Sequence, residues 1–274
     1  MKAIHSSFLL SFLWLFLGCA SSHTAINTGT LLRGKNYTIT KHYDEASQTY
    51  YFLTQIDHKD KRGRLIQLRH ALAEKDTGET VRQLAVKAGA MLAFNASTQR
   101  RPTPATKAPS GVQIVDGKII QDIKTSAYTL GVKANNELVF YRPGTKATEI
   151  LQDGSVNALT AFIPLIVNHV NADDSVMVVN KHLIQKHPRQ VIAQFGNLDL
   201  LFLSCGGRGF DGEGMTSKDL MRILQGLHVK FAYMLDGGGS TSTVVGKTLI
   251  TKKIDEKGTQ ERTRPDFLYF MPVK

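Results

Sequence analysis

One stretch near the C-terminal end holds the residues best suited to chemistry. It begins with the apolar run Tyr233–Leu235, passes through Asp236, and ends in small and polar residues: Gly237, Gly238, Gly239, Ser240 and Thr241. An apolar strand would deliver the Asp236 carboxylate at its end, where it could act as a general acid or base or orient a substrate hydroxyl. Consecutive glycines fit a loop in which the main chain approaches a ligand closely, or in which free N–H groups hold an anion. The pattern predicts a catalytic Asp236 beside a ligand-binding loop, with a plain glycine-rich turn as the alternative.

Three further polar residues fit the same chemistry. Arg189 and Arg208 are candidate phosphate ligands, because a guanidinium fork matches the oxygens of a phosphate group. Asn95 follows the apolar segment 90–94 and suits recognition of a sugar hydroxyl or acid–base work. The structural alternatives are a surface position for each arginine and a turn for Asn95. We predict that Asp236 and Asn95 are catalytic and that both arginines and residues 237–241 bind substrate.

No pattern of metal ligands stands out. The nine histidines lack a His-Glu-x-x-His spacing, so a catalytic zinc is not expected. Asp211 and Glu213 lie in a glycine-rich loop that lacks the length and ligand number of an EF-hand, so a plain loop is favoured and a divalent cation is the alternative. Ser240 follows the glycines, but the chain has no Gly-x-Ser-x-Gly signature of a nucleophile elbow. We expect no cofactor.

Two amphipathic helices are predicted to position these segments. Residues 79–88 and 217–225 each place their apolar side chains three or four positions apart, on one face of a helix. Thr216 and Asp219 give the second helix a start of the capping-box type, and Gly226 fits the residue that ends a helix. An apolar strand that ends at a polar residue follows each helix.

Strand patterns are more frequent than helix patterns. Asp116-Gly117, Asn135-Asn136 and the segment 197–199 each separate two apolar segments, and such residues favour the positive φ of hairpin turns. Alternating segments at 37–42, 50–56 and 64–69 add further strands. The predicted fold class is α+β, with a mixed, largely antiparallel sheet and a few packed helices in a single domain.

The N-terminal residues predict a targeting signal. A positive start precedes the short apolar run 8–17, and small residues follow, as in a secretory signal peptide. Leu17-Gly18-Cys19 resembles a bacterial lipobox, in which the cysteine is lipidated, and an ordinary signal peptide is the alternative. We predict a signal peptide at 1–19 with lipidation at Cys19, a tether at 20–35 and a domain at 36–274. The protein would then be exported and anchored to the membrane of the envelope, or otherwise be periplasmic or secreted.

Composition excludes several classes of protein. The chain has 274 residues, of which 42% are hydrophobic and 21% charged, which excludes wholesale disorder. Two cysteines are too few for a disulfide scaffold, and with Cys19 as an anchor Cys205 is expected to be a small buried side chain. The net charge of +11 permits any polyanion as a partner. Because the basic clusters lack interleaved aromatic residues, no nucleic acid partner is expected. The pattern favours no particular oligomeric state.

From Glu79 to the C-terminus, a series of short motifs resembles the phosphodiester glycosidase family. The strongest match is Leu-Asp-Gly-Gly-Gly-Ser at 235–240, after a capped helix. Weaker matches follow the order of the family: the helix and strand that end at Asn95, the hairpin 111–120, Pro188-Arg189, Gly207-Arg208 and the closing segment 261–270 with Arg264-Pro265. The resemblance implies hydrolysis that removes N-acetylglucosamine from a sugar-phosphate diester.

Two departures from the family pattern bear on this expectation. Ala96-Ser97-Thr98 follows Asn95 where the family has Gly-Gly-aromatic, and Gly206 stands where the family often has Asp. The resemblance implies a hydrolase of sugar-1-phosphate diesters in envelope or extracellular glycans, with a phosphate-bearing glycan as its substrate. Phosphate is a good leaving group, so such a site needs few carboxylates. The departures keep a second hypothesis open, a non-catalytic module that binds anionic glycans in the same cleft.

Overall fold

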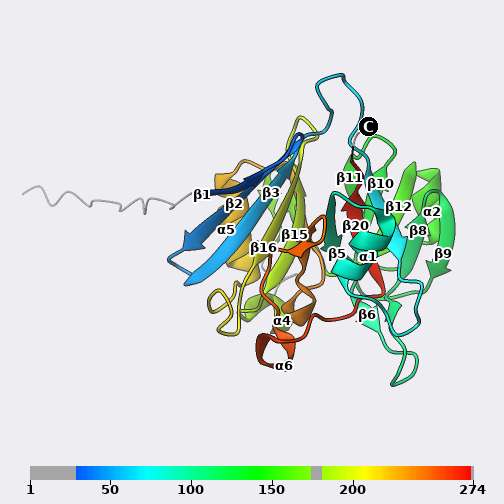
Figure 1. The fold of residues 1–274 in the computed structure, drawn as a ribbon. Coiled ribbons are helices and arrows are strands. Elements are labelled where there is room, and N and C mark those ends of the chain that lie inside the picture. The colour runs from blue at the N-terminus through cyan, green and yellow to red at the C-terminus, as the bar shows by residue number, and fades with distance from the viewer. Residues whose placement is uncertain (1–28, 174–180, 273–274) are drawn as a thin grey trace, which may run out of the picture.

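The computed structural model describes residues 29–173 and 181–272, which form several antiparallel sheets (Figure 1). The largest sheet has eight strands. Their spatial order is β1 (Gly29–Arg33), β2 (Tyr37–Asp44), β3 (Thr49–Ile56), β16 (Leu200–Cys205), β15 (Arg189–Gln194), β17 (Phe231–Met234), β13 (Pro164–Val167) and β14 (Val170–Asn171). Among its central strands, β15 carries Arg189, and β16 and β17 lead to Arg208 and Asp236.

Two five-stranded sheets and a small hairpin complete the sheet structure. One sheet contains, in spatial order, β11 (Leu138–Tyr141), β10 (Thr129–Lys133), β12 (Ser155–Thr160), β8 (Val112–Val115) and β9 (Lys118–Asp122). The other contains β19 (Thr248–Leu249), β18 (Thr243–Val245), β5 (Leu92–Asn95), β20 (Asp266–Phe270) and β4 (Leu68–Leu72). The hairpin pairs β6 (Gln99–Arg100) with β7 (Ala108–Pro109).

Helices are few and short. They are α1 (Val81–Ala88), α2 (Ala147–Gln152), α4 (Lys181–Ile184), α5 (Ser217–Gly226) and α6 (Asp255–Gly258), with a 3-10 turn η1 (Gly238–Ser240). Every strand pair among the described residues is antiparallel, so the expected mixed sheet is corrected to purely antiparallel sheets there. The described part of the chain is mostly β structure, with helices as minor elements.

Local capping signals fixed the starts of the two predicted helices. Thr216 and Asp219 form a capping box at the start of α5, as predicted. α1 begins at Val81 rather than at residue 79, because Thr80 caps it and Gln83 completes a capping box. Gly226 remains inside α5 instead of ending it, and His228 takes the left-handed conformation after it, with φ 56°.

The predicted hairpin turns are present, while two strand boundaries differ. Asp116 and Gly117 have φ of 46° and 77°, and Asn136 has φ 67°, which are the left-handed conformations that such turns require. The strand expected at 64–69 begins only at Leu68. β1 pairs with β2, so the sheet begins at Gly29, inside the segment predicted as a tether. Cys19 and the predicted signal peptide lie outside the described residues.

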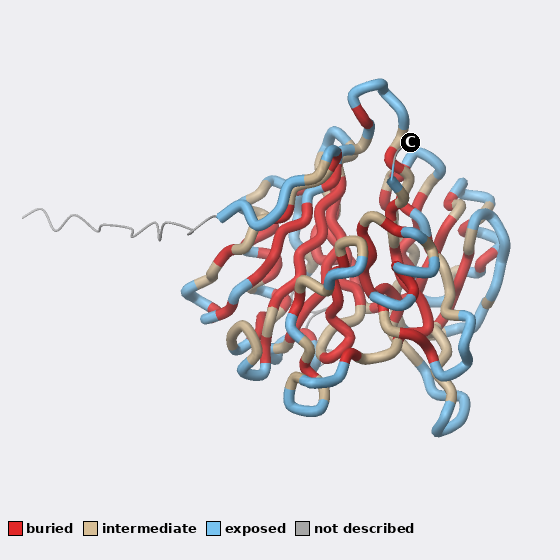
Figure 2. Tube along the Cα trace, in the orientation of Figure 1, coloured by how far each residue is buried: buried red, intermediate tan, exposed pale blue. Residues whose placement is uncertain are grey.

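Apolar packing on both faces holds the eight-stranded sheet in place, and Figure 2 shows its central strands as buried. On one face, the rings of Phe94 and Phe202 stack with centroids 3.7 Å apart, and Phe270 meets both edge-on. On the other face, α5 buries Leu220 and Leu224 completely. Full burial of such a side chain contributes about 1.5–3 kcal/mol, so the strands that carry Arg189 and precede Asp236 sit in a rigid frame.

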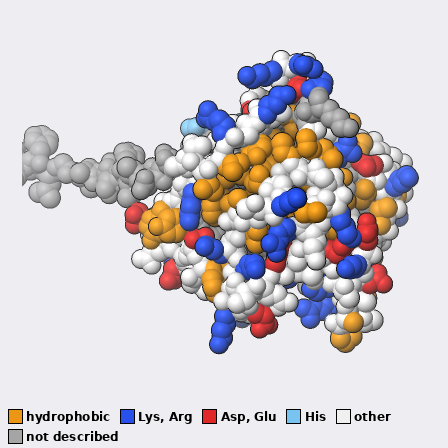
Figure 3. All heavy atoms as spheres, in the orientation of Figure 1, with side chains coloured by type: hydrophobic (Ala, Val, Ile, Leu, Met, Phe, Trp, Pro, Cys, Tyr) orange, Lys and Arg blue, Asp and Glu red, His pale blue; other side chains and the backbone are white. Residues whose placement is uncertain are grey.

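Basic side chains are dispersed over the surface that is visible in one view (Figure 3). Figure 3 shows Lys and Arg spread over the visible face with acidic residues between them, and no continuous basic stripe is visible there. No helix among the described residues is long and apolar enough to cross a membrane.

Candidate active site

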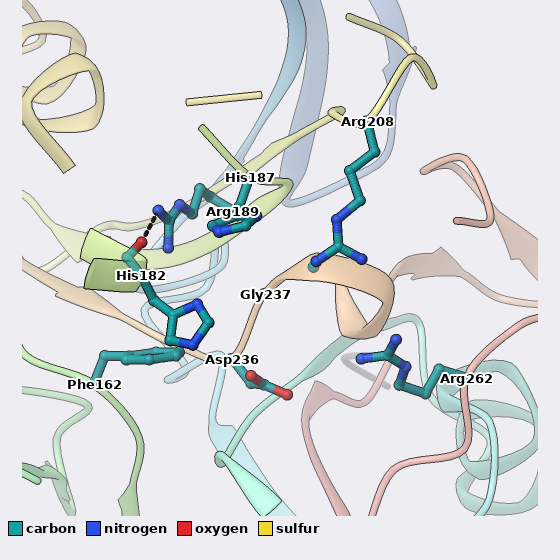
Figure 4. A pocket seen from close by; sticks show the side chains of 9 residues that line it. Phe162, His182, His187, Arg189, Arg208, Asp236, Gly237 and Arg262 are labelled. Carbon is teal, nitrogen blue, oxygen red and sulfur yellow. Dashed lines mark hydrogen bonds between the residues drawn. The ribbon is translucent and has the colours of Figure 1, made fainter. Parts of the chain in front are cut away.

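Segments far apart in the sequence meet at an open pocket of about 200 Å³ (Figure 4). Its lining residues are Phe162, His182, His187, Arg189, Arg208, Asp236, Gly237, Gly238 and Arg262. Five residues predicted to act on substrate therefore share one pocket: Arg189, Arg208, Asp236, Gly237 and Gly238. Asn95, Gly239, Ser240 and Thr241 do not line this pocket, and the contacts below place them in or behind its wall.

Asp236 follows β17 and presents its carboxylate to the pocket. Its Oδ2 forms an ion pair with Arg264 Nη2 at 2.9 Å, and its backbone N–H donates to the carbonyl of Ala96 at 3.0 Å. No described residue donates to Asp236 Oδ1. The side chain is 16% exposed, so one carboxylate oxygen is fixed and the other remains accessible to a ligand.

Arg264 holds Asp236 in place, and the sequence, which showed it only in the match Arg264-Pro265, did not predict it as a site residue. Its side chain is fully buried, and besides Asp236 it donates to Ser97 O at 2.7 Å, Gln99 Oε1 at 2.8 Å and Ser240 Oγ at 2.9 Å. These contacts fix the guanidinium and, through it, the Asp236 carboxylate. A usable signal was present in Arg262 and Arg264, which stand two positions apart in the segment before the closing strand, where alternate residues of an extended chain share a face.

The side-chain amide of Asn95 is bonded within the protein and positions the glycine loop. Its side chain is fully buried, its Nδ2 donates to Asp236 O at 2.6 Å, and its Oδ1 accepts from Ser242 N at 2.9 Å. The Asn95 amide thus joins the two ends of the glycine loop. The predicted direct part of Asn95 in acid–base work has no geometric support in this arrangement.

The departure after Asn95 lies inside the protein. Ala96 and Ser97 are both fully buried. Ser97 donates through Oγ to Asp266 Oδ2 at 2.5 Å and through its backbone N to Asp266 Oδ1 at 3.1 Å, while its carbonyl accepts from Arg264. Ser97 therefore supports Arg264 from behind and does not line the pocket.

At each position of the glycine run, a side chain would come too close to a neighbouring atom. A Cβ at Gly237 would lie 2.6 Å from Pro188 O, and one at Gly239 would lie 2.5 Å from Arg262 Nη2. Gly238 has φ +62°, which side chains rarely adopt, and its Cβ position lies 3.1 Å from Arg208 Nη2. The run therefore lets the backbone approach two arginines and a buried strand at once.

The expected anion nest of free N–H groups is wrong for most of the loop. Gly238 N donates to Pro188 O at 2.8 Å, Ser240 N to Gly237 O at 3.2 Å, and Thr241 N to Gly238 O at 3.2 Å. These donors are consumed by the 3-10 turn and by the segment that enters β15. Ser240 and Thr241 are buried as well, and Ser240 Oγ accepts from Arg264 instead of facing a ligand. An anion in this pocket must be held mainly by side chains.

Arg189 is a buried cation without a carboxylate partner among the described residues. Only 3% of it is exposed, and it donates to the carbonyls of Met215 at 2.9 Å, Gln185 at 2.7 Å and His182. Burial, with a smaller contribution from the neighbouring Arg208, lowers the pKa of Arg189 to about 10. Carbonyl oxygens accept from Nε and Nη2, and Nη1 lies 3.8 Å from Met234 Sδ. None of these contacts neutralises the charge, so the field of Arg189 remains available to an anion.

Arg208 reaches the same pocket from the loop between β16 and α5. It is exposed, has φ 58°, and extends its guanidinium over Gly238. No described residue forms an ion pair with it. The second departure from the family pattern, Gly206 where Asp is often found, has a steric reason. A Cβ at this position would lie 2.6 Å from the Cβ of Asp211 and 2.7 Å from its carbonyl oxygen. The loop that carries Arg208 thus folds back over the position of the missing side chain.

Two histidines, His182 and His187, line the pocket beside the arginines. The rings of His182 and His187 are 5.7 Å apart. Burial lowers the pKa of His187 to about 4, with smaller contributions from the charges of Arg189 and Arg208. His187 is therefore neutral at neutral pH, and its buried Nδ1 has no hydrogen-bond partner. Because the charges of both arginines lower the pKa of His187, the three groups form one electrostatic cluster.

Arg262 forms the wall opposite the histidines (Figure 4). It makes a bidentate pair with Asp255, with Nε–Oδ2 and Nη2–Oδ1 both at 2.6 Å, and its Nη1 lies 3.5 Å from Ser240 Oγ. Phe162 contributes an apolar surface on the side of His182. Neither Arg262 nor Phe162 was among the predicted site residues.

The acidic loop forms no metal site in the described part of the chain. Asp211 pairs with Lys41 at 3.4 Å, and neither it nor Glu213 lines the pocket. The described residues contain no group of three His, Cys, Asp or Glu side chains placed to hold a metal ion. Cys205 is buried and free, and burial raises the pKa of its thiol to about 12, which suits a packing role rather than a nucleophile.

The fold is similar to that of several solved structures. The catalytic domain of zebrafish N-acetylglucosamine-1-phosphodiester alpha-N-acetylglucosaminidase, auto-inhibited by its pro-peptide, matches with a TM-score of 0.69 at 17% identity, covering 90% of this chain and 88% of that one. A hypothetical protein from Synechocystis matches with a TM-score of 0.63 at 14% identity, covering 91% of this chain and 64% of that one. At such low identities these likenesses establish the fold.

A curated relative and a family model extend the comparison. The SPbeta prophage-derived uncharacterized protein YomE of Bacillus subtilis (strain 168) is 30% identical over 176 residues, which are 61% of this chain. The matched region spans only 26% of the length of that protein. The model of the phosphodiester glycosidase family matches residues 75–271, which include every described pocket residue, and the chain therefore belongs to the phosphodiester glycosidase family.

Proposed function

We propose that this chain is a hydrolase that cleaves the bond between C1 of a sugar and the oxygen of a phosphodiester. Membership of the phosphodiester glycosidase family supports glycosidase chemistry. One observation carries the proposal: Asp236 shares a pocket with two arginines, Arg189 and Arg208, that have no carboxylate partner among the described residues. Such a pocket matches a substrate that bears an anionic group beside a reacting carbon.

The two arginines fit the phosphate of the substrate. A buried guanidinium without a counter-charge is costly, and a bound phosphate would supply that charge. Arg208 is exposed and extended, so it can reach the outer phosphate oxygens, while Arg189 acts from beneath through its field. Their combined charge stabilises the phosphate as it leaves C1 with the electron pair of the glycosidic bond.

Asp236 fits the other side of the reaction. Its Oδ2 is tied to Arg264, so Oδ1 is the atom available to accept a proton from water or to attack C1. The ion pair with Arg264 places this carboxylate as a base or nucleophile rather than as a general acid. A phosphate leaving group makes a general acid unnecessary, which agrees with a single carboxylate in the lining.

The proposed substrates are sugar-1-phosphate diesters of the N-acetylglucosamine type in envelope or extracellular glycans. The zebrafish enzyme of similar fold is named for a diester of this type, which supports the choice of the first test compound. Purified protein is incubated with an N-acetylglucosamine-1-phosphodiester, and free sugar is measured over time. We expect continuous release by the wild-type protein and none by Asp236→Ala. If both proteins are equally inert toward every glycosyl phosphodiester tried, the proposal is wrong.

A second candidate function is a module that binds anionic glycans without cleaving them. The observation that favours it is the replacement of the family's Gly-Gly-aromatic pattern by Ala96-Ser97-Thr98. Calorimetry with the same diester separates the two functions. Binding without hydrolysis over several days would support the module, and measurable turnover would exclude it.

We also propose that the protein is exported and anchored through a lipid on Cys19. The support is the sequence pattern of a charged start, a short apolar run and Leu17-Gly18-Cys19. Labelling with a radioactive fatty acid in a bacterial host tests it. The wild-type chain should carry the label, Cys19→Ser should lose it, and Cys205→Ser is the matched control that should keep it. Equal labelling of all three chains would contradict the proposal.

A further inference from the structure

The pocket carries more positive charge than the single negative charge of a phosphodiester can neutralise. Two of the arginines in and behind its wall are neutralised, Arg264 by Asp236 and Arg262 by Asp255. Arg189 and Arg208 keep their charges, and no described carboxylate pairs with either. His187 adds no compensating charge, since it is neutral at neutral pH. The pocket therefore carries two uncompensated positive charges.

Both of these charges act at the same place. Arg208 lowers the pKa of Arg189, and both arginines lower the pKa of His187. These groups approach the pocket from β15, from the loop after β16 and from the segment between α4 and β15. Like charges brought together in a cleft focus a positive field, which favours a multiply charged anion over a singly charged one.

The proposed reaction changes the charge of the phosphate. A phosphodiester carries one negative charge. Hydrolysis at C1 transfers the hydroxyl group of water to the sugar, the phosphate leaves with the electron pair of the C1–O bond, and the second proton of the water is released. The product is a phosphomonoester, whose charge at neutral pH is about −1.5 to −2 because its second pKa is about 6. The product therefore matches the pocket better than the substrate does.

We propose that this pocket binds phosphomonoester dianions more tightly than phosphodiester monoanions, so that the phosphomonoester product inhibits the enzyme. Only the identity of that product rests on the proposed function; the preference for a dianion rests on the pocket charges alone. Release of the phosphomonoester then limits turnover, and a reaction that consumes phosphomonoesters is needed to keep the enzyme active.

The other charged groups that face the pocket do not remove this preference. Asp236 repels any anion, but its charge is opposed by Arg264 at 2.9 Å. Arg262 stays paired with Asp255 through two contacts of 2.6 Å. The titratable and charged groups around a bound anion are thus His182 from α4, His187, Arg189, Arg208, Asp236 and Arg262, with Asp255 and Arg264 behind them.

Calorimetry with three small anions tests the charge preference directly. Methyl phosphate is a dianion at pH 7.5, dimethyl phosphate is a monoanion of similar size, and inorganic sulfate is a dianion at every pH used. We expect methyl phosphate to bind at least about tenfold more tightly than dimethyl phosphate, as expected when one further charge meets two guanidinium groups. Equal or weaker binding of methyl phosphate would overturn the inference.

The dependence on pH shows which partner titrates. Between pH 7.5 and pH 5 methyl phosphate gains a proton, so its affinity should fall toward that of dimethyl phosphate, while the affinity for sulfate should not fall. A fall for sulfate parallel to that for methyl phosphate would show that protonation of the ligand is not the cause of the loss, and the inference would be wrong. Arg208→Gln should bring the ratio of the two affinities close to one. The exposed Arg101→Gln is the matched control and should leave the ratio unchanged.

An inhibition assay separates this inference from the proposed function. Turnover of an N-acetylglucosamine-1-phosphodiester that methyl phosphate inhibits no better than dimethyl phosphate would refute the inference and leave the function standing. Tight binding of methyl phosphate by a protein that hydrolyses no glycosyl phosphodiester would support the inference and refute the function. We expect turnover together with competitive inhibition by methyl phosphate.

Discussion

Two clusters of polar side chains differ in whether their hydrogen bonds and charges are complete. In the first, Asp266 accepts from His70 Nε2 at 3.0 Å, from Ser97 Oγ at 2.5 Å and from Ser97 N at 3.1 Å. His70 Nδ1 lies 3.2 Å from Ile114 O. His70, Ser97 and Asp266 are at most 2% exposed, so this cluster is closed to ligands.

The second cluster, formed by Arg189, Arg208 and His187, is open. Among the described residues Arg189 lacks a counter-charge, Arg208 extends over Gly238 without an ion-pair partner, and His187 Nδ1 is buried and unbonded. Both clusters contain a histidine beside charged side chains, so the presence of such residues alone does not separate a structural cluster from a binding site. Incomplete pairing does, because a protein without a ligand there gains nothing from uncompensated charge.

The largest effect is expected from the carboxylate beside the open cluster. Asp236→Asn keeps the shape of the side chain and removes its charge, so sugar release from a glycosyl phosphodiester should fall by about 10²–10⁴-fold. Initial rates at saturating substrate measure this change. Asp116→Asn, in an exposed hairpin turn, is the matched control and should keep the wild-type rate. A rate for Asp236→Asn within about threefold of wild type would remove Asp236 from the chemistry.

The closed cluster should instead control stability. Asp266→Ala leaves His70 and Ser97 with buried, unpaired groups, so the free energy of unfolding should fall by about 3 kcal/mol or more. Denaturant unfolding followed by circular dichroism measures this loss. If the variant unfolds at the same denaturant concentration as wild type, the cluster is not structural and the contrast between the two clusters fails.

The exposed arginine of the open cluster should behave in the opposite way. Arg208→Ala is expected to raise KM for the diester about tenfold, through the loss of one charge-assisted contact, and to change the free energy of unfolding by less than about 0.5 kcal/mol. Steady-state kinetics and the same unfolding experiment provide both numbers. A loss of stability without a change of KM would assign Arg208 to the fold rather than to substrate binding.

The smallest effect concerns the titration of His187. Burial and the two arginines lower its pKa from 6.5 to about 4, so the unfolded chain binds this proton more readily than the folded one. The corresponding stability is complete above pH 6.5 and is lost as the pH falls toward 4. A bound phosphate offsets the arginine charges and should raise the pKa of His187.

NMR of the imidazole ring, with and without methyl phosphate, follows this titration. His187→Asn identifies the signal by its loss. A pKa of His187 near 6.5 in the free protein, or one that phosphate leaves unchanged, would show that the histidine and the arginines do not form one cluster.

Much of the local structure could be predicted because its signals are local. The capping box of Thr216 and Asp219 and the turn at Asp116-Gly117 depend on residues within a few positions of one another. The arrangement into separate antiparallel sheets could not be predicted in this way. β5, for example, lies between β18 and β20, whose residues are about 150 and 175 positions farther along the chain.

The candidate site also has features that the sequence shows and features that depend on long-range contacts. Asp236 and the glycine run are visible in the sequence because three consecutive glycines need a reason. The burial of Asn95 and the role of Arg264 are not visible, since both follow from contacts between residues 141 and 28 positions apart. The unpaired state of Arg189 is likewise a property of the packed structure, because a sequence shows an arginine but not the absence of its partner.

A crystal structure of the protein with methyl phosphate would test the central claim most directly, that the open cluster is an anion site beside a reactive carboxylate. We expect the phosphate above Arg189, with its oxygens about 2.7–2.9 Å from the guanidinium nitrogens of Arg208 and with Asp236 Oδ1 facing the space next to it. An empty pocket at a methyl phosphate concentration that saturates binding in calorimetry, or a phosphate bound elsewhere, would contradict the account.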